Sequence, residues 1–219
     1  MNEYIPVLRR TQIFAGVSND EIRSMLLCLD ARLRHYKKGE YVLREGEHLN
    51  DIMILADGRL HIQKDDYWGN RSILEQISMG EMFGEAYTAS ESGPLLNDVV
   101  AAENSAVIFF NAKRIITTCP TACRFHTIVV QNLFFSISEK NRKLVRKLSH
   151  MSKRSIREKL ISYLSEEATR QNSSSFTIPF NRQQLADFLF VDRSAMSNEL
   201  SKMRKEGLLE FERNCFKLL

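Results

Sequence analysis

The sequence has 219 residues, of which 43% are hydrophobic and 26% charged. This is the composition of a globular protein with room for one large domain or two modest ones, and it excludes disordered and collagen-like chains. No apolar run has the roughly 18 to 20 residues that a membrane span requires, and the first residues lack the basic start and apolar core of a secretory signal. We therefore expect a cytoplasmic protein without membrane contact.

Positive charge is concentrated in the C-terminal part of the chain. Residues 1–137 carry 14 Lys and Arg against 17 Asp and Glu, whereas residues 138–219 carry 17 against 10. Such a segment attracts an anionic partner, and nucleic acid is the leading candidate. The alternative is a solvated helical surface of mixed charge.

The four cysteines are too few and too scattered for a disulfide framework, so we expect reduced thiols. Cys119 and Cys123 lie four residues apart and His126 follows, which makes a thiol or metal sensor an alternative to small buried cysteines. A fourth ligand is missing, and the other histidines are isolated, with nothing that marks a haem ligand. We expect no metal and no cofactor.

Residues 39–84 have the pattern of short strands joined by turns. Six of the nine glycines fall in this stretch. Residues 51–55 are an apolar run, Asp57-Gly58 indicates a hairpin, and residues 60–63 alternate as in a half-buried strand. Residues 99–110 supply one or two further strands. The pattern predicts an antiparallel roll or barrel.

A long helix is predicted after Pro120, which suits a first helical position. No glycine occurs between Pro94 and Glu206, and no further proline occurs until Pro179. Heptads counted from residue 130 predict a dimer seam with Val130, Leu133, Ile137 and Leu144 as apolar members; the complete set of core positions is Val130, Leu133, Ile137, Lys140, Leu144, Lys147 and Met151, five of which are apolar. The alternative is an amphipathic helix that packs on its own β domain through a face widened by Phe125, Phe134 and Phe135.

Two short helices joined by about three residues are predicted in residues 181–207. Asn181 and Gln184 form a capping box, Asp192 is an N-cap, and Gly207 is a C-terminal stop. A helix precedes them at residues 155–169, a polar loop follows at 171–175, and residues 176–178 form a short strand. The arrangement is typical of a helix-turn-helix.

The early residues of the second helix face base edges in this motif. Arg pairs with guanine, Asn with adenine, and Ser with either a base or a phosphate. Residues 208–211 and 215–218 flank Arg213-Asn214 as a terminal hairpin, the wing of a winged helix. An ordinary helical hairpin with a polar face is the alternative. We predict these DNA-binding residues: Arg193, Ser194, Ser197, Asn198, Arg182 and Lys202, with Arg204 and Lys205 near phosphates.

Nearly the whole chain resembles the bacterial regulators that include the cyclic-AMP receptor protein and FNR. The resemblance rests on the order and spacing of Lys38-Gly39-Glu40, Arg44-Glu45-Gly46-Glu47, Asp57-Gly58, Gly80-Glu81-Met82-Phe83-Gly84-Glu85, Leu185-Ala186-Asp187, Val191-Asp192-Arg193-Ser194, and residues 202–208. It implies an α+β chain with an N-terminal antiparallel β-roll of the jelly-roll, cyclic-nucleotide-binding type, a long dimerisation helix and a C-terminal winged helix-turn-helix. It also implies a homodimer on a roughly two-fold symmetric DNA site.

The sequence departs from the family pattern at three positions. Leu96 stands about where nucleotide-binding members have the Arg that neutralises the phosphate, and the only arginine between residues 60 and 113 is Arg71, so we expect no cyclic nucleotide. Phe190 occupies the turn position that is usually Gly, so we expect an altered turn. Asn198 stands where many relatives have Arg, which predicts a different half-site. The N-terminal cysteine cluster of the iron-sulfur branch is absent before Cys28.

The sequence predicts a transcription regulator whose activity is set by an effector bound at or sensed by the β-roll. The predicted domains are residues 1–118 with N-terminal helices, the helix and hinge 119–151, and the winged helix 152–219. The partners are double-stranded DNA, a second copy and an unidentified effector, with RNA polymerase a further candidate. No enzyme motif is present. The alternative function is a ligand-binding or protein-interaction module without specific DNA affinity. The predicted effector pocket comprises Gly84, Glu85, Leu96, Val99, Phe125 and Val129.

Overall fold

The computed structural model describes residues 1–65, 67–68, 71–88, 93–117 and 124–219. The chain divides into two compact units, Met1–Ser138 and Glu139–Leu219. Each unit is described by itself. Helix α4 (Arg124–Met151) contains the boundary between them. Pro120 and the cysteine pair 119 and 123 lie outside the described residues.

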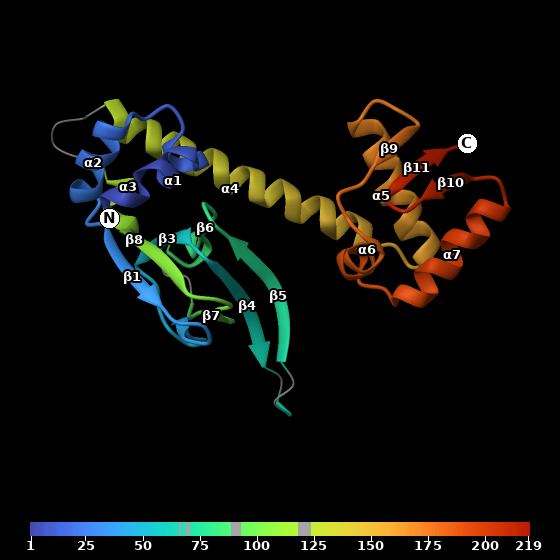
Figure 1. Cartoon of the computed structure of the whole chain (residues 1–219), viewed down its shortest axis with the longest axis horizontal. Coiled ribbons are helices and arrows are strands. Elements are labelled where there is room, and N and C mark those ends of the chain that lie inside the picture. The colour runs from blue at the N-terminus through green and yellow to red at the C-terminus, as the bar shows by residue number, and fades with distance from the viewer. Residues whose placement is uncertain (66, 69–70, 89–92, 118–123) are drawn as a thin grey trace. The chain divides into compact units, whose positions relative to one another are not determined.

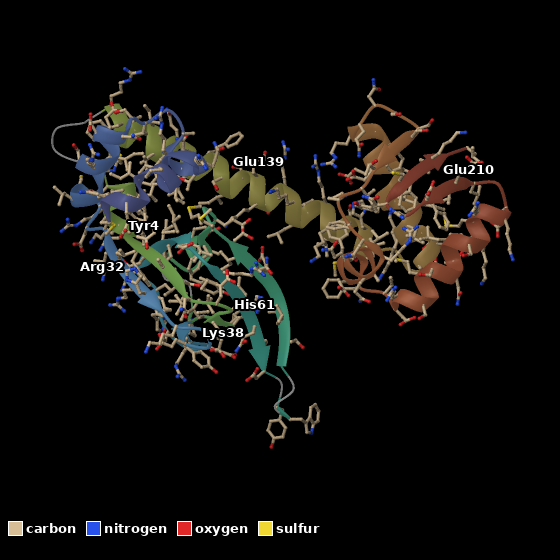
Figure 2. The ribbon with its side chains drawn as sticks, in the orientation of Figure 1. Tyr4, Arg32, Lys38, His61, Glu139 and Glu210 are labelled. Atoms are coloured by element: carbon tan, nitrogen blue, oxygen red, sulfur yellow. The ribbon has the colours of Figure 1, made fainter. Side chains whose placement is uncertain are left out.

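The first unit is built on a β-roll of two antiparallel four-stranded sheets with strand orders β1-β8-β3-β6 and β2-β7-β4-β5 (Figure 1). Arg32, labelled on β1 in Figure 2, forms an ion pair with Asp51 on β3, across the intervening β8. The mixed α+β architecture predicted from the sequence is confirmed. The strands are β1 (Arg32–Tyr36), β2 (Tyr41–Leu43), β3 (Asp51–Asp57), β4 (Arg59–Asp65), β5 (Arg71–Ser78), β6 (Met82–Phe83), β7 (Asp98–Ala101) and β8 (Ser105–Asn111).

Strands β3 and β8 are buried on both faces, which explains their continuous apolar runs. Along β3, Met53 and Leu55 face the interior of the roll, whereas Ile52 and Ile54 face helices on the outside. Those helices are η1 (Asn2–Tyr4), α1 (Ile5–Arg10), η2 (Gln12–Phe14), α2 (Asn19–Cys28), α3 (Ala112–Ile116) and the first turns of α4 (Figure 1). The first unit therefore has an inner and an outer hydrophobic core that share one sheet.

The prediction of a β hairpin at Asp57-Gly58 is wrong. Strands β3 and β4 flank this dipeptide but belong to different sheets, so the turn is a corner between sheets. Gly58 has φ +86°, and a Cβ there would clash with Ser105 and with the carbonyl of Asn104. The β hairpin of this region is instead the long β4–β5 pair.

The second unit packs three helices against a small sheet of order β10-β11-β9 (Figure 1). The helix ends follow from the sequence: the predicted box of Asn181 and Gln184, the Asp192 cap on Ala195 N and the stop at Gly207 are all confirmed. Ser155 and Glu158 form a further capping box. The elements are α5 (Ile156–Arg170), β9 (Ser175–Thr177), α6 (Arg182–Leu189), α7 (Arg193–Lys205), β10 (Leu209–Glu212) and β11 (Cys215–Leu218).

Among the described residues, no helix combines the length and apolar character that crossing a membrane requires.

Candidate DNA interface

Helix α7 is held by one apolar stripe and presents a polar face to solvent. Met196, Leu200 and Met203 are at most 2% exposed and pack in the core of the second unit. At 100° per residue, Ser194, Asn198 and Lys205 lie on the opposite side of the helix, and all three are exposed. Of the other predicted contacts on α7, Arg193 and Lys202 are exposed and Ser197 is half-buried.

The turn between α6 and α7 keeps the left-handed residue of the motif, so the predicted alteration is wrong. Phe190 has φ 52° and ψ 58°. Its N–H donates to Asp187 O at 3.2 Å, and Val191 N donates to Ala186 O at 3.0 Å, which is the Schellman pattern. Lys159 on α5 donates to the carbonyls of Leu189 and Phe190 at 3.1 and 3.5 Å. These hydrogen bonds hold a conformation that a residue with a side chain disfavours.

Arg157 of α5 ties α7 to its neighbour on the other flank. Its Nε lies 2.6 Å from Glu199 Oε1, and both Nη atoms lie 2.8 Å from the carboxylate of Glu206. These hydrogen bonds raise the pKa of Arg157 and lower that of Glu206. The orientation of α7 is therefore set by its core stripe and by one guanidinium group.

The wing is attached through stacked arginines. The guanidinium carbon of Arg182 lies 4.7 Å from the Phe211 ring centroid and 5.0 Å from that of Phe216, and Arg204 lies 5.6 Å from that of Phe211. Burial lowers the pKa of Arg182. Arg182 thus packs α6 against the wing, and its contact with DNA stays a prediction.

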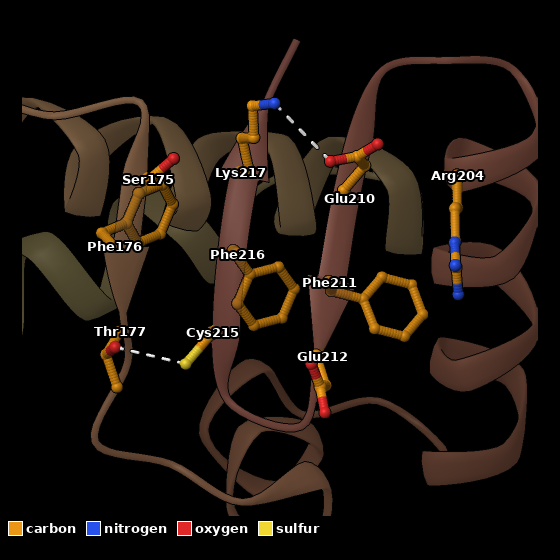
Figure 3. A pocket seen from close by; sticks show the side chains of 10 residues that line it. All are labelled: Ser175, Phe176, Thr177, Arg204, Glu210, Phe211, Glu212, Cys215, Phe216 and Lys217. Carbon is orange, nitrogen blue, oxygen red and sulfur yellow. Dashed lines mark hydrogen bonds and ion pairs between the residues drawn. The ribbon is translucent and has the colours of Figure 1, made fainter.

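The wing also presents features that the sequence did not single out. Arg213 at the turn of the hairpin is exposed with φ 52°, and Asn214 Nδ2 beside it donates to Ile178 O at 3.1 Å. The sheet lines a shallow hollow of about 680 Å³ where Lys217 Nζ lies 3.7 Å from Glu210 and Thr177 Oγ1 lies 3.4 Å from Cys215 Sγ (Figure 3). Glu210 and Glu212 in its lining oppose a phosphate contact there.

The structure does not bring the six predicted effector-pocket residues together. Val99 belongs to the inner core, whereas Phe125 and Val129 pack in the outer core on the other side of a sheet. Leu96 is 58% exposed, and its neighbour Leu95 fills the inner core at 4%. The alignment of Leu96 with the phosphate-binding Arg of the family stays a prediction.

The turn that follows β6 contains a glycine in the left-handed backbone conformation. Gly84 has φ +84°, and a Cβ there would clash with the side chain of Met53 in the inner core. Glu85 follows in the short 3₁₀ helix η3 (Glu85–Tyr87). These two residues lie on the inner-core side of the roll.

The predicted seam on α4 includes a residue that the first unit itself uses. Leu133 is 6% exposed in the outer core, whereas Ile137 and Leu144 are 40% and 66% exposed and Val130 is half-buried. His126 is 2% exposed and its Nε2 lies 2.8 Å from Ile115 O, which is a structural role. No group of three metal-ligating side chains occurs within the described part of the chain.

Comparison with known proteins assigns both units. Residues 33–120 match the family of the cyclic nucleotide-binding domain, and residues 158–219 match the Crp-like helix-turn-helix domain. The two matches follow one another in the order expected for this architecture and together cover more than half of the chain. The chain belongs to the CRP/FNR family. Its second unit carries the Crp-like helix-turn-helix domain.

Solved CRP/FNR structures share this fold. The chain matches CprK in complex with OCPA with a TM-score of 0.62 and 16% identity, over 91% of each chain. It matches the c-di-GMP-responsive global regulator CLP of Xanthomonas campestris with a TM-score of 0.54 and 16% identity, over 89% of this chain and 97% of that one. At these identities the likeness concerns the fold alone.

Curated relatives match part of the chain. cGMP-dependent protein kinase 2 of Mus musculus is 29% identical over 103 residues, which are 47% of this chain and 13% of that protein. The potassium channel KAT1 of Oryza sativa subsp. japonica is 28% identical over 82 residues, 37% of this chain and 11% of that protein. This chain therefore spans only a small part of these relatives.

Proposed function

We propose that this CRP/FNR regulator acts as a homodimer that binds a roughly two-fold symmetric DNA site through two copies of α7. The exposed polar face of α7 carries the proposal. Arg193 provides a fork for guanine, Asn198 an amide for adenine, and Ser194 and Ser197 provide hydroxyls for a base or a phosphate. Lys202 and Lys205 further along the helix are exposed cations for phosphates.

The exposed apolar residues of α4 support the homodimer. They are Phe134, Phe135, Ile137, Leu144, Val145 and Leu148, exposed between 40% and 75%. A heptad seam through residues 130, 134, 137, 141, 144, 148 and 151 has one polar member, Asn141. This register replaces the one that contains Leu133 and Lys147, because Leu133 is buried in its own unit and Lys147 lies 5.0 Å from the Phe190 ring centroid.

The effector, in this proposal, is sensed by the β-roll and carries little negative charge. The inner core is lined by apolar side chains such as Leu95, Val99 and Phe83. Lys64, Arg71 and Lys113 are the only Lys and Arg residues between positions 60 and 113. Lys64 Nζ lies 3.3 Å from the carbonyl oxygen of Leu96 and 3.7 Å from Glu45. A buried phosphate without a cation would be costly. The proposal also includes the predicted domain boundaries, which fall after residues 118 and 151.

The DNA-binding proposal is tested by placing a negative charge on the polar face of α7. Ser194→Asp is expected to lower affinity for a pool of genomic fragments by at least about tenfold at 0.1 M salt, because a carboxylate repels the phosphates. Ser165→Asp on α5 is the matched control, since Ser165 is equally exposed but lies on a helix outside the proposed interface. Equal binding by both variants would contradict the proposal and favour a ligand-binding or protein-interaction module.

A further inference from the structure

Helix α7 carries two acidic residues beside the face proposed to bind DNA. Glu199 and Glu206 lie seven residues apart, so two helical turns place them on one flank. Unpaired carboxylates at this position would repel the phosphates on both sides of a groove. In the structure, both carboxylates bind the same guanidinium, that of Arg157.

Arg157 stands where a helix by itself disfavours a cation. It is the second residue of α5, next to Ser155 and Glu158 of the capping box, in the first turn where the helix dipole is positive. Interactions within α5 do not explain an arginine here, whereas its three hydrogen bonds to Glu199 and Glu206 do. The Arg157 side chain is 35% exposed, and that of Glu199 is 18% exposed.

Lys202 shares one of these carboxylates. Its Nζ lies 3.8 Å from Glu199 Oε2, while Arg157 binds Oε1 of the same group at 2.6 Å. The shorter, charge-assisted hydrogen bond goes to Arg157, so Lys202 is only loosely engaged. Without Arg157, Glu199 would recruit Lys202 and withdraw it from a phosphate.

We propose that Arg157 is a positioning residue of the DNA interface, which neutralises Glu199 and Glu206 and thereby frees Lys202 to contact a phosphate. The inference rests on the proposed function of α7. It assigns to the helix before the helix-turn-helix a share in DNA affinity without a DNA contact of its own.

The test compares the salt dependence of DNA binding in four proteins. Arg157→Gln is expected to weaken binding to specific and random duplexes about tenfold at 0.1 M salt, and to reduce the slope of log K against log salt by about 1. The variant with Arg157→Gln, Glu199→Gln and Glu206→Gln together is expected to regain wild-type affinity and slope. A merely structural role of Arg157 would leave this triple variant as weak as the single one, which would overturn the inference.

Arg170→Gln is the matched control. Arg170 lies on the same helix about 20 Å from Arg157 and forms an ion pair with Glu167 at 2.6 Å. Its substitution therefore removes the same charge as Arg157→Gln but removes no contact with α7. Its affinity and slope are expected to equal those of the wild type. Equal losses in Arg157→Gln and Arg170→Gln would reduce the effect to net charge and overturn the inference.

A second measurement separates this inference from the proposed function. Carbon-13 NMR of the Glu206 carboxyl in the full chain is expected to show a pKa below the ordinary value, which rises in Arg157→Gln. A wild-type protein that binds no DNA would contradict the proposed function. A Glu206 pKa that is unchanged in Arg157→Gln would overturn the role of Arg157, whatever the DNA result.

Discussion

Phe190 shows how a single residue is held in a conformation that its side chain disfavours. The left-handed region costs a residue with a Cβ about 1 to 2 kcal/mol relative to Gly. Two backbone hydrogen bonds of the Schellman pattern and the Lys159 ammonium hold it there, and its ring is 63% exposed. The sequence indicated the conflict between residue and turn, but it could not show that hydrogen bonds from α5 would decide it.

Phe190→Gly is therefore expected to raise the free energy of unfolding by about 1 kcal/mol at most, because relief of strain exceeds the added entropy of the unfolded chain. Urea unfolding of the full chain measures this change. Phe190→Ala keeps the Cβ and loses only the ring contact with Lys147, so it is expected to give no gain. A gain as large with Ala as with Gly would show that the backbone of Phe190 is not strained.

Arg193→Ala tests direct base recognition. We expect a loss of about 1 to 3 kcal/mol of specific affinity and relaxed selectivity at one base pair, because a bidentate contact to guanine is removed. Fluorescence anisotropy on a selected duplex and on a random one measures both quantities. Equal losses on the two duplexes would assign Arg193 to a phosphate instead.

Among the helices and strands, the sequence predicted helix ends and turns better than it predicted which strands pair with each other. The caps at Asn181 and Asp192 and the stop at Gly207 are local signals, and the structure confirms them. The turn at Asp57-Gly58 was identified, but whether its two strands pair with each other depends on contacts with β7 and β8 that lie far along the chain. Local patterns do not contain that information.

Helix α4 illustrates the same limit. A heptad count cannot tell an apolar residue used inside one unit, such as Leu133, from an apolar residue left in solvent, such as Phe134. Both satisfy a 3.5-residue period over a short stretch. Burial in the structure separates them, and it moves the seam positions 133, 140 and 147 by one residue, to 134, 141 and 148.

Leu148→Glu tests the revised seam. Leu148 is 64% exposed and lies in the new register but not in the one counted from the sequence. We expect the substitution to weaken the dimer at least about tenfold and DNA binding with it, because it places a charge in an apolar seam. Sedimentation equilibrium measures the dimer constant.

The control for the register is Lys147→Glu. Lys147 belongs to the seam counted from the sequence, yet its Nζ contacts the rings of Phe188 and Phe190 in its own unit. We expect its dimer constant to stay close to that of the wild type. The reverse order of effects, with Lys147→Glu the more disruptive, would restore the original register.

The β-roll of the whole molecule has the fold of a cyclic nucleotide-binding domain, but no Lys or Arg side chain among its described residues is buried. We predict that isothermal titration calorimetry shows no saturable binding of cyclic AMP or cyclic GMP at concentrations up to about 1 mM, since a desolvated phosphate needs a cation. Micromolar binding by the wild type would contradict the prediction.

The sequence predicted the fold more completely than it predicted the residues of the functional sites. The β-roll and the helix-turn-helix follow from glycine spacing, helix caps and helical period, and both are confirmed. Val99 and Val129, which the predicted effector pocket brings together, pack in two different cores because β3 and β8 are buried on both faces. Arg157 was missed because only its contacts with Glu199 and Glu206, far along the chain, distinguish it from other exposed arginines.

Selection of genomic fragments by the purified protein across a range of salt concentrations measures whether two copies of α7 bind a symmetric DNA site. We expect recovered fragments that share a palindrome with half-sites about 34 Å apart, retained at salt concentrations where random DNA is released. Recovery of fragments without a common sequence, all released together as salt rises, would contradict it.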